Sequence, residues 1–514
     1  MLLRLQRHSV NGPTTTGTSL AANANSWLKK RTLALWLAYM ALTLILAAPL
    51  LLVEVPMGVD TLNHLARIHV RAHIADDADL ARLYELRDAW VPYMGLDWLM
   101  TPMARVMPTL VAGRVFIILL LWGTVGAVMV LQRTFTGRIG FEPLLVGLVS
   151  YNGLLAWGFL NYMLGVVGAL LGLAAWHATR GRSWGWRLLL FTGVATSMYF
   201  VHLLALALYG AMLGAYEVFG RRQPWRTPLQ DWMVLGLQFC PAAVLVLQLP
   251  MLPSSGNLGL SWIWGDKPII LASPFLFSGG AGGLDSGLLV FILCAYLLVR
   301  LTRAGALRWN RRLAAVALVL AVMGLAVPKR AFGVALVDFR FPVVAAYIAV
   351  AALNITPGVG RRLWPVALVL AGAVLFQVAS ATTAMRACDR QYAEVRAALQ
   401  AVPRGEVLAA VVETEHPVLG MRCTNLGIYD HLPQLMALDR SGYSPDFFAN
   451  VTPIAIRNGR TTDKEPIRTH LLAPNMLPQH GYVLWMHFGN HDRPVPPGLT
   501  PLREGSFFTL YATE

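Results

Sequence analysis

The sequence predicts a polytopic α-helical membrane protein with about eleven transmembrane helices and a small α/β domain at its C-terminus. Of its 514 residues, 56% are hydrophobic and only 13% are charged, about half the charged fraction of an average soluble domain. Apolar runs of about 20 residues recur from Leu33 to Thr383, and each is long enough to cross a bilayer as a helix. The net charge of +15 does not indicate nucleic-acid binding, because the Lys and Arg residues are scattered at the ends of these runs.

The N-terminus is predicted to stay in the cytoplasm. Residues 1–28 are polar and lack the apolar stretch of a cleavable signal peptide, so we expect a disordered cytoplasmic tail. The first apolar run, 33–53, follows Lys29, Lys30 and Arg31 and is too long for the apolar part of a signal peptide. Positive charge before an uncleaved span favours a cytoplasmic N-terminus.

Ten more apolar runs complete a membrane domain that is predicted over residues 29–384. Every second loop between them is rich in arginine, which places those loops on the cytoplasmic side. The Arg- and Ala-rich composition is typical of a bacterium with a GC-rich genome, so we expect a multi-pass protein of the bacterial inner membrane. The predicted spans after the first are 107–131, 143–157, 160–177, 188–201, 203–219, 232–250, 286–302, 312–328, 341–355 and 363–384.

Two long segments are then predicted on the periplasmic side. The loop 54–106 is expected to contain amphipathic helices. The tail 385–514 is expected to form an extracytoplasmic α/β domain, because its polarity is mixed and it contains strand-like runs. Cys388 and Cys423 both fall in this tail, where an oxidising compartment permits a disulfide, but a sequence cannot give the distance between them. The strand-like runs are 406–412, 481–488 and 506–514.

Three polar residues share one helical face directly after the first span. In "MGVDTLNHLARIHV" (57–70), Asp60, His64 and Arg67 are spaced i, i+4 and i+7, so on a helix their side chains point the same way. A carboxylate there can take the proton of an attacking hydroxyl. His64 can orient that carboxylate or meet a phosphate, and Arg67 can pair with either. The alternative is an interfacial amphipathic helix with a capping Asp.

This stretch resembles the first outer loop of the GT-C superfamily of membrane glycosyltransferases, in which an acidic residue just after the first span is catalytic. The layout of spans, long first outer loop and outer C-terminal domain is also similar. The resemblance implies that a sugar is moved from a polyprenyl-phosphate carrier to a lipid, glycan or protein acceptor on the outer face, with Asp60 as the catalytic residue. Many members have two acidic residues here, whereas Asp60 is followed by Thr61 and Glu54 lies six residues earlier. A divalent metal is therefore left open, because the sequence has no DxD motif here that would support metal binding. No other cofactor is indicated.

A polyprenyl-phosphate leaving group requires fixed positive charge on the outer side. The stretch "PKRAFGVALVDFRFP" (328–342) places Lys329, Arg330 and Arg340 around Asp338 at the outer ends of two spans. Topology does not require positive charge there, which makes these residues candidates for phosphate binding. The alternative is that they extend to the membrane interface as ordinary snorkelling side chains.

His202 is a further candidate, because it lies in the apolar hairpin turn "MYFVHLLA" (198–205). A histidine in such a setting needs a partner, which a substrate can supply. A hydrogen bond between helices would satisfy it equally well. The predicted substrate- and phosphate-binding set is therefore His64, Arg67, His202, Lys329, Arg330 and Arg340, with no metal ligand predicted.

Three other functions stay open beside a transferase. A flippase or transporter for lipid-linked sugars predicts charges in mid-span and paired repeats with broken helices; Arg114 is the clearest intramembrane charge, and no repeat is visible. A glycan polymerase or ligase would lack the acidic helix after the first span. A non-catalytic GT-C-like scaffold is suggested by the single acidic residue. The expected partners are a lipid-linked donor and membrane lipids, and the sugar, the acceptor and the oligomeric state are not given by the sequence.

Overall fold

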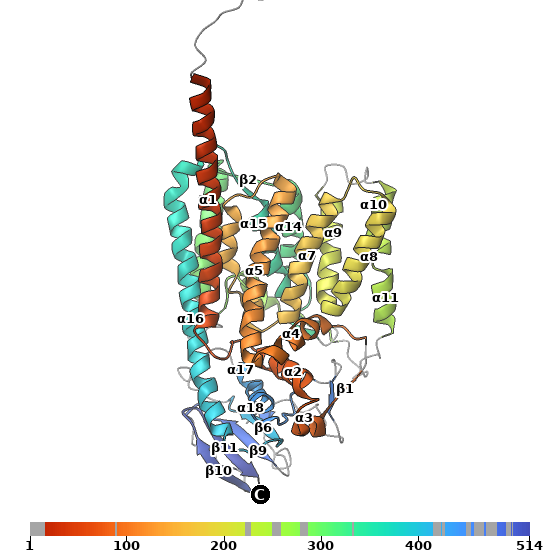
Figure 1. Ribbon diagram of the computed structural model, residues 1–514, viewed down its shortest axis with the longest axis vertical. Helices are drawn as coiled ribbons and strands as arrows, with labels where there is room; N and C mark the ends of the chain where they lie inside the picture. Colours follow the sequence, from red (N-terminus) through yellow and green to blue (C-terminus); the bar gives the residue numbers. More distant parts are fainter. Residues whose placement is uncertain are drawn as a thin grey trace, which may run out of the picture.

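In the computed structural model, long helices run side by side and a small sheet domain covers one end of them (Figure 1). The helices of this bundle are α1 (Thr16–Leu51), α5 (Thr109–Thr136), α7 (Leu160–Ala178), α8 (Trp184–Val201), α9 (Leu203–Val218), α10 (Leu229–Leu237), α11 (Cys240–Leu247), α13 (Ser286–Arg303), α14 (Arg311–Ala326), α15 (Arg340–Ala352) and α16 (Trp364–Leu399). The structure describes residues 16–513 except 88–89, 221–227, 249–258, 278–285, 332–333, 415–422, 424–426, 449–453, 457–466, 469–480, 490–494 and 496, and only the backbone of 16–31, 361 and 467–468.

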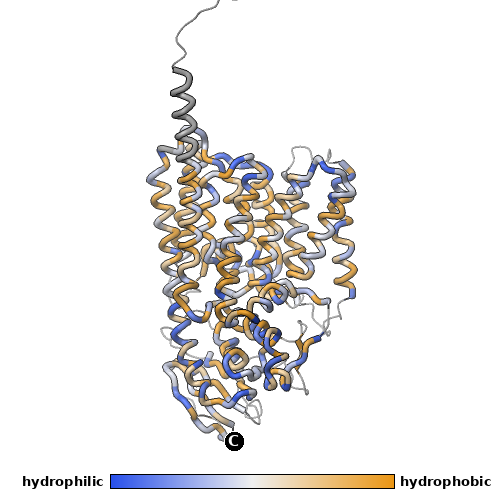
Figure 2. The backbone as a smooth tube through the Cα atoms, viewed as in Figure 1, coloured by the Kyte–Doolittle hydropathy of each residue, from blue (hydrophilic) through white to orange (hydrophobic). Residues whose placement is uncertain are grey.

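Hydrophobic residues cover most of the length of these helices (Figure 2). Six of the described helices are long and apolar enough to cross a membrane, and α9 and α15 are shorter apolar helices. The chain is therefore a multi-pass membrane protein. The six candidate spans are Thr32–Leu51, Thr109–Thr136, Leu160–Ala178, Leu229–Leu247, Ser286–Arg303 and Trp364–Leu399.

The predicted span 143–157 is not a transmembrane α-helix, and the predicted count of eleven spans is not confirmed. The segment forms a 3₁₀ helix, η1 (Glu142–Val149), and a single turn, α6 (Gly153–Ala156). Asn152 makes this break possible, because its side chain accepts the first N–H groups of α6 and donates to the Val149 carbonyl oxygen. Irregular backbone is tolerated at membrane depth when it is buried in protein, as most of this segment is.

The structure of the N-terminal segment also differs from the predicted disordered tail 1–28. Residues 1–15 lie outside the described residues, but α1 already begins at Thr16, so residues 16–28 are helical. Alanine recurs in this stretch and proline is absent until Pro49, so the helix of the first span extends toward the N-terminus.

Three short helices follow the first span. They come from the predicted loop 54–106 and are α2 (Thr61–His73), α3 (Ala78–Leu83) and α4 (Met94–Val106). Two of them, α2 and α4, lie between the bundle and the C-terminal domain, and the third, α3, lies beside that domain (Figure 1). The remaining short elements of the membrane part are η3 (Trp264–Asp266), α12 (Lys267–Ile270), η4 (Gly360–Leu363) and the paired strands β2 (Leu307–Trp309) with β5 (Leu353–Ile355) and β3 (Arg330–Ala331) with β4 (Val334–Ala335).

The C-terminal domain contains a five-stranded sheet in the order β10-β11-β9-β6-β8. Strand β6 is parallel to both of its neighbours, and the β9-β11-β10 side is antiparallel. Three of these strands match the predicted strand-like runs. The elements are β6 (Leu408–Val412), α17 (Gly427–Asp430), η6 (Leu432–Gln434), α18 (Leu435–Arg440), β7 (Ile454–Ile456), β8 (Ile467–Arg468), β9 (Tyr482–Met486), β10 (Leu499–Glu504) and β11 (Phe508–Thr513).

The C-terminal domain is tied to the rest of the chain in three ways. Helix α16 runs without a break from the bundle to Leu399, so the predicted domain boundary at 384 falls inside it. Strand β1 (Tyr84–Leu86) pairs antiparallel with β7. Side chains of α2, α3 and β1 share a hydrophobic core with Ala437, Tyr443 and Phe447.

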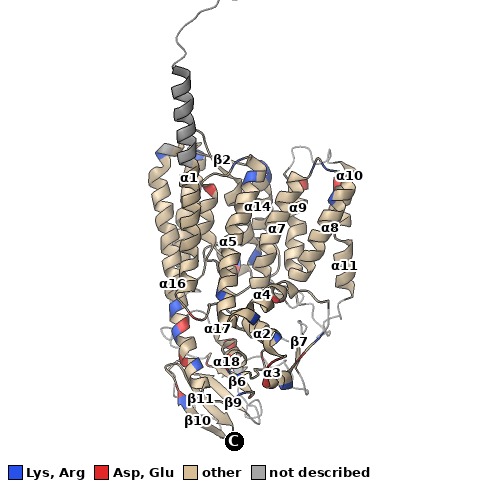
Figure 3. Ribbon diagram, in the orientation of Figure 1, with Lys and Arg blue, Asp and Glu red and all other residues tan. Residues whose placement is uncertain are grey.

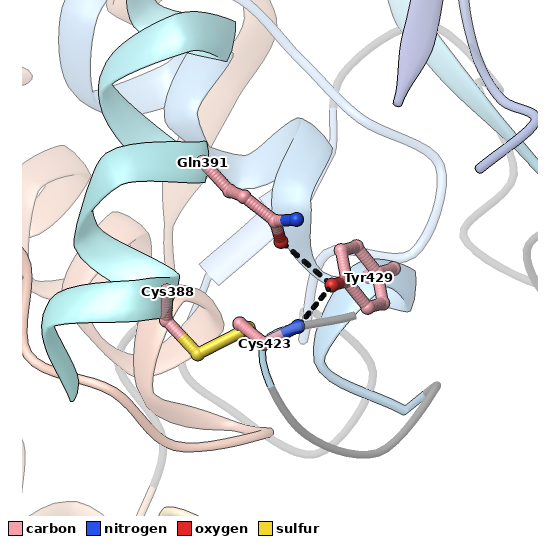
Figure 4. Close-up of a disulfide and its surroundings, with 4 residues drawn as sticks. All are labelled: Cys388, Gln391, Cys423 and Tyr429. Atoms are coloured by element: carbon pink, nitrogen blue, oxygen red, sulfur yellow. Dashed lines mark hydrogen bonds between the residues drawn. A yellow bond between two sulfur atoms is a disulfide. The ribbon is translucent and has the colours of Figure 1, made fainter. Parts of the chain in front are cut away.

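A disulfide strengthens this attachment. Cys388 of α16 is bonded to Cys423, which settles the pairing that the sequence left open (Figure 4). Beside it, the Tyr429 hydroxyl donates to Gln391 Oε1 at 2.6 Å and accepts from the Cys423 N–H at 2.9 Å. The disulfide and these hydrogen bonds hold the start of α17 against α16.

Candidate active site

A cavity of about 150 Å³ lies where α2, the helix bundle and the C-terminal domain meet. This volume is below the roughly 300–1,000 Å³ of typical ligand pockets, so the cavity suits a headgroup more than a complete lipid-linked sugar. Five of the seven site residues predicted from sequence line it, although they are spread over 280 residues of the chain. The lining residues are Asp60, His64, Arg67, Tyr93, Phe159, Asn161, Tyr162, His202, Arg340 and Phe448.

Close backbone contact fixes the position of Asp60. Its N–H donates to the Trp157 carbonyl oxygen at 3.0 Å. Gly158 lies against this segment with φ of +71°, and a Cβ there would come within 2.9 Å of the Asp60 nitrogen. Glycine adopts this conformation without strain, and its lack of a Cβ permits the close approach. Asp60 occupies the N-cap of α2 without capping it through its side chain, so the carboxylate, 23% exposed, remains available to the cavity.

His64 and Arg67 share a face of α2 with Asp60, as the spacing predicts. Arg67 does not pair with Asp60, because its Nε donates to Asp97 Oδ1 at 3.0 Å in a fully buried ion pair with α4. Burial and the Arg67 guanidinium lower the pKa of His64 to about 3, so its imidazole is neutral. Arg67 Nη2 and His64 Nδ1 are buried without a hydrogen-bond partner among the described residues. Both can therefore bind a group that enters the cavity.

One side of the cavity, which we call the membrane wall, consists of Phe159, Tyr162, His202 and Arg340. The guanidinium carbon of Arg340 lies 3.9 Å from the centre of the Phe159 ring and 5.2 Å from that of Tyr162, and such cation–π contacts hold it in place. His202 Nδ1 accepts the Leu204 N–H at 3.1 Å, so the neutral ring carries its proton on Nε2. That nitrogen lies 3.4 Å from Arg340 Nη1. The N–H groups of His202 and Arg340 therefore face each other, and an acceptor placed between them could accept a hydrogen bond from both.

Arg340 does not pair with Asp338, the carboxylate beside it in sequence. Lys267 Nζ takes that carboxylate at 2.6 Å, and both side chains are almost completely buried. The guanidinium of Arg340 instead contacts the carbonyl oxygens of Leu336 and Ala335, and in the described part of the chain no ion pair joins it to a carboxylate. Arg340 is thus a buried cation, 5% exposed, without a counter-charge in contact.

The other two predicted phosphate-binding residues lie outside the lining of the cavity. Lys329 makes an ion pair with Asp266 at 2.5 Å. Arg330 is exposed at the start of the β3–β4 hairpin, where it pairs with Ala335 in the sheet register. Neither residue therefore lines the cavity beside Arg340, although the three are close in sequence.

Tyr93 and Asn161 shape the cavity near His202. Tyr93 has φ of +71°, a conformation that is rare outside glycine and often found at functional sites. Its ring packs edge-on against that of His202 with 4.8 Å between the centroids. Asn161 donates to the Tyr93 carbonyl oxygen at 3.0 Å and accepts the Leu96 N–H at 2.8 Å. Asn161 therefore fixes the start of α4 against α7.

On the opposite side, the C-terminal domain contributes Phe448 to the lining. His431 of the same domain contacts Asp60 from outside the lining and is held by Asp446. We call Phe448, His431 and Asp446 the domain wall. His431 Nδ1 donates to Asp446 Oδ2 at 2.9 Å, and its Nε2 lies 3.4 Å from Asp60 Oδ1. Burial alone would lower the pKa of His431, but the hydrogen bonds and charges of Asp446 and Asp60 raise it to about 10. The ring is therefore an imidazolium at neutral pH, shared between two carboxylates. Asn63 of α2 fastens this wall by accepting the Phe448 N–H at 2.8 Å.

The domain wall is the part of the site that sequence reasoning missed. His431 follows Asp60 by more than 370 residues in a segment without a recognisable motif, and only the fold brings the two together. Aromatic lining residues have no characteristic spacing either. The lining residues absent from the predicted set are Tyr93, Phe159, Asn161, Tyr162 and Phe448.

Among the described residues, no group of three or more His, Cys, Asp or Glu side chains is arranged to hold a metal ion.

Comparison with known proteins gives the fold. No protein-family model matches the sequence, and a search of curated proteins finds no match. Among solved structures, the chain is similar to the crystal structure of ArnT from Cupriavidus metallidurans bound to undecaprenyl phosphate. The TM-score is 0.52 at 12% identity, over 92% of this chain and 97% of that chain. ArnT is a GT-C glycosyltransferase, so the GT-C fold that the sequence resemblance predicts is confirmed.

Proposed function

We propose that this GT-C-fold protein is a glycosyltransferase that moves a sugar from a polyprenyl-phosphate carrier to a lipid, glycan or protein acceptor at the periplasmic face of the bacterial inner membrane. The observation that carries the proposal is Arg340, a buried guanidinium without a carboxylate partner in the described residues. An isolated buried charge is strongly unfavourable. A phosphate would supply its counter-charge.

The groups around Arg340 suit a phosphate more than a carboxylate side chain. His202 directs its Nε2 toward the same space. The Tyr162 hydroxyl, which is buried and has no hydrogen-bond partner among the described residues, lines the same cavity. Hydrogen bonds from a charged guanidinium are stronger than those between neutral groups, and Arg can bind a phosphate in a bidentate geometry. The ArnT structure contains undecaprenyl phosphate, which supports the same class of lipid here.

Asp60 is then the base of the reaction. The acceptor oxygen forms a bond to the anomeric carbon, and the bond between that carbon and the phosphate oxygen breaks with its electron pair leaving on the carrier phosphate. Asp60 takes the hydroxyl proton, while Arg340 balances the charge that develops on the leaving group. Asp60 and Arg340 line the same cavity, so both tasks fall within one site.

The proposed orientation follows from charge and disulfide chemistry. Lys and Arg residues gather at the end of the bundle remote from the C-terminal domain, around β2 and α10 (Figure 3), and such residues favour the cytoplasmic side. The Cys388–Cys423 disulfide lies in the C-terminal domain and is typical of an oxidising compartment such as the periplasm.

Binding of radiolabelled undecaprenyl phosphate to nanodisc-reconstituted protein tests the proposal. We expect Arg340→Gln to weaken binding about 10- to 100-fold, the usual loss for a charged hydrogen-bonding group, and Arg340→Lys to restore it only in part. Arg330→Gln, on the same segment but outside the cavity, is expected to bind like the wild type. Equal binding by wild type and Arg340→Gln would contradict the assigned phosphate site.

Transfer itself is measured as release of undecaprenyl phosphate from a panel of undecaprenyl-phosphate-linked monosaccharides, with bacterial envelope glycolipids as acceptors. Release with one donor supports the transferase. Binding without release from any donor favours the non-catalytic scaffold, and movement of the donor across the bilayer without release favours a flippase.

A further inference from the structure

The C-terminal domain contacts Asp60 through a firmly held segment. The disulfide and Tyr429 fasten the start of α17 to α16, and His431 follows directly after α17. Beyond it, Asp446 accepts from Gln434 Nε2 at 2.7 Å and Ser444 Oγ at 2.5 Å, both on Oδ1. Its other oxygen, Oδ2, accepts from His431. A carboxylate with this many donors cannot rotate freely, so it fixes the orientation of the imidazole.

The contact between His431 and Asp60 leaves one carboxylate oxygen for chemistry. Nε2 of His431 approaches Oδ1 of Asp60, and Asp60 Oδ2 has no partner among the described residues. The titratable groups around His431 are the two carboxylates on either side of it, Asp446 and Asp60, and His64 of α2, whose imidazole is neutral. A histidine that serves only to dock the domain would not need to face a carboxylate in the cavity.

We propose that His431, held by Asp446, is a positioning residue for Asp60 and that sugar transfer requires the C-terminal domain to be docked. The inference rests on the proposed function. His431 donates to Oδ1 throughout, so Oδ2 points to the acceptor. When the acceptor oxygen bonds to the anomeric carbon, its proton passes to Oδ2 and the carrier phosphate leaves with the bonding electrons. The group of Asp60, His431 and Asp446 changes from one net negative charge to neutral, and the proton later leaves Asp60 to water through its exposed edge.

The arrangement also explains why a single acidic residue suffices after the first span. The second carboxylate of the site, Asp446, is contributed by the C-terminal domain through His431. The imidazolium between the two carboxylates offsets the repulsion that two negative charges at close range would otherwise produce.

The test compares His431→Gln and Asp446→Asn with the wild type in nanodiscs, with His487→Gln as the matched control. His487 is a buried histidine of the same domain that contacts Gly489 and Thr509, away from the cavity. We expect His431→Gln to lower kcat for transfer about 10- to 100-fold, with KM for the lipid-linked donor and binding of undecaprenyl phosphate within about twofold of wild type. His487→Gln should transfer like the wild type.

The pH profile separates positioning from a purely structural role. In the wild type, transfer should fall as the pH rises through about 10, where His431 loses its proton, and this alkaline limb should be absent in His431→Gln. Limited proteolysis checks that the C-terminal domain of each variant remains docked. Full transfer by a docked His431→Gln variant would overturn this inference alone. A wild type that binds undecaprenyl phosphate but transfers no sugar would overturn the proposed function and the inference with it.

Discussion

The membrane wall and the domain wall differ in whether their positive charge is paired with a carboxylate. Among the described residues, no carboxylate contacts Arg340 of the membrane wall, so its positive charge lacks a counter-charge in contact until an anion binds. The domain wall holds the positive charge of His431 between Asp446 and Asp60, so it is balanced from within. An unbalanced buried charge is suited to binding, whereas a balanced network is suited to orienting a reacting group. The membrane wall therefore fits the carrier phosphate, and the domain wall fits the handling of the acceptor proton.

The most direct way to break this division is to neutralise Asp60. Asp60→Asn keeps the shape of the side chain but removes the base, so we expect transfer to fall about 10²- to 10⁴-fold, the usual contribution of general base catalysis. Undecaprenyl phosphate binding should stay within about twofold, because the phosphate contacts Arg340 and not Asp60. The exposed Asp76→Asn is the control. An equal loss of binding and transfer in Asp60→Asn would show that the two walls are not functionally separate.

A substitution at Gly158 tests the same division through geometry. An alanine Cβ would press against the backbone nitrogens of Asp60 and Thr61, at a residue whose φ is +71°. We expect transfer to fall about 100-fold, since a shift of about 1 Å in a catalytic group has effects of that size, with a smaller loss of lipid binding. Gly126→Ala is the matched control, because its Cβ would meet nothing within 4 Å. Normal transfer by Gly158→Ala would mean that the position of Asp60 is not critical.

How far the sequence predicts the site differs between the walls. The i, i+4, i+7 spacing of Asp60, His64 and Arg67 is a local pattern, and the structure places all three on the cavity. His202 and Arg340 could be singled out because polar groups in apolar surroundings are rare. Nothing in the sequence around His431 distinguishes it, because a histidine is ordinary among the polar residues of such a domain. Its role depends on its contact with Asp60, which is distant in sequence.

The same limit applies to the fold. Hydropathy predicts a helical membrane domain, but it cannot show that Asn152 breaks one apolar run into a 3₁₀ helix and a short turn. Hydropathy also cannot predict which charged residues form ion pairs. Asp338 is only two residues from Arg340 in sequence, yet its carboxylate pairs with Lys267, 71 residues away. Local patterns identify which side chains are unusual, whereas their partners are decided by packing between distant segments.

Removal of the disulfide should loosen the domain wall and spare the membrane wall. Cys388→Ser opens a 35-residue link whose loss is worth about 3–4 kcal/mol in the chain-entropy description. We expect faster proteolysis of the C-terminal domain and reduced transfer, with undecaprenyl phosphate binding unchanged. A thiol reductant should reproduce the effect in the wild type. Cys294→Ser, which removes a free cysteine, is the control, and equal protease resistance of both variants would contradict an anchoring role.

The smallest expected effect is the pH dependence of domain docking. His431 has a pKa of about 10 in the folded protein against about 6.5 when unfolded, so its contribution to stability is complete below pH 6.5 and is lost as the pH rises through 10. Between pH 7 and 8 the unfolding free energy of the docked domain should fall by about 1 kcal/mol. Protease resistance of the C-terminal domain measures this, and His431→Gln should be flat over the same range. A wild type that is equally resistant at pH 7 and pH 9 would mean that His431 is not held as an imidazolium between Asp60 and Asp446, and the two walls would then no longer differ in how they balance charge.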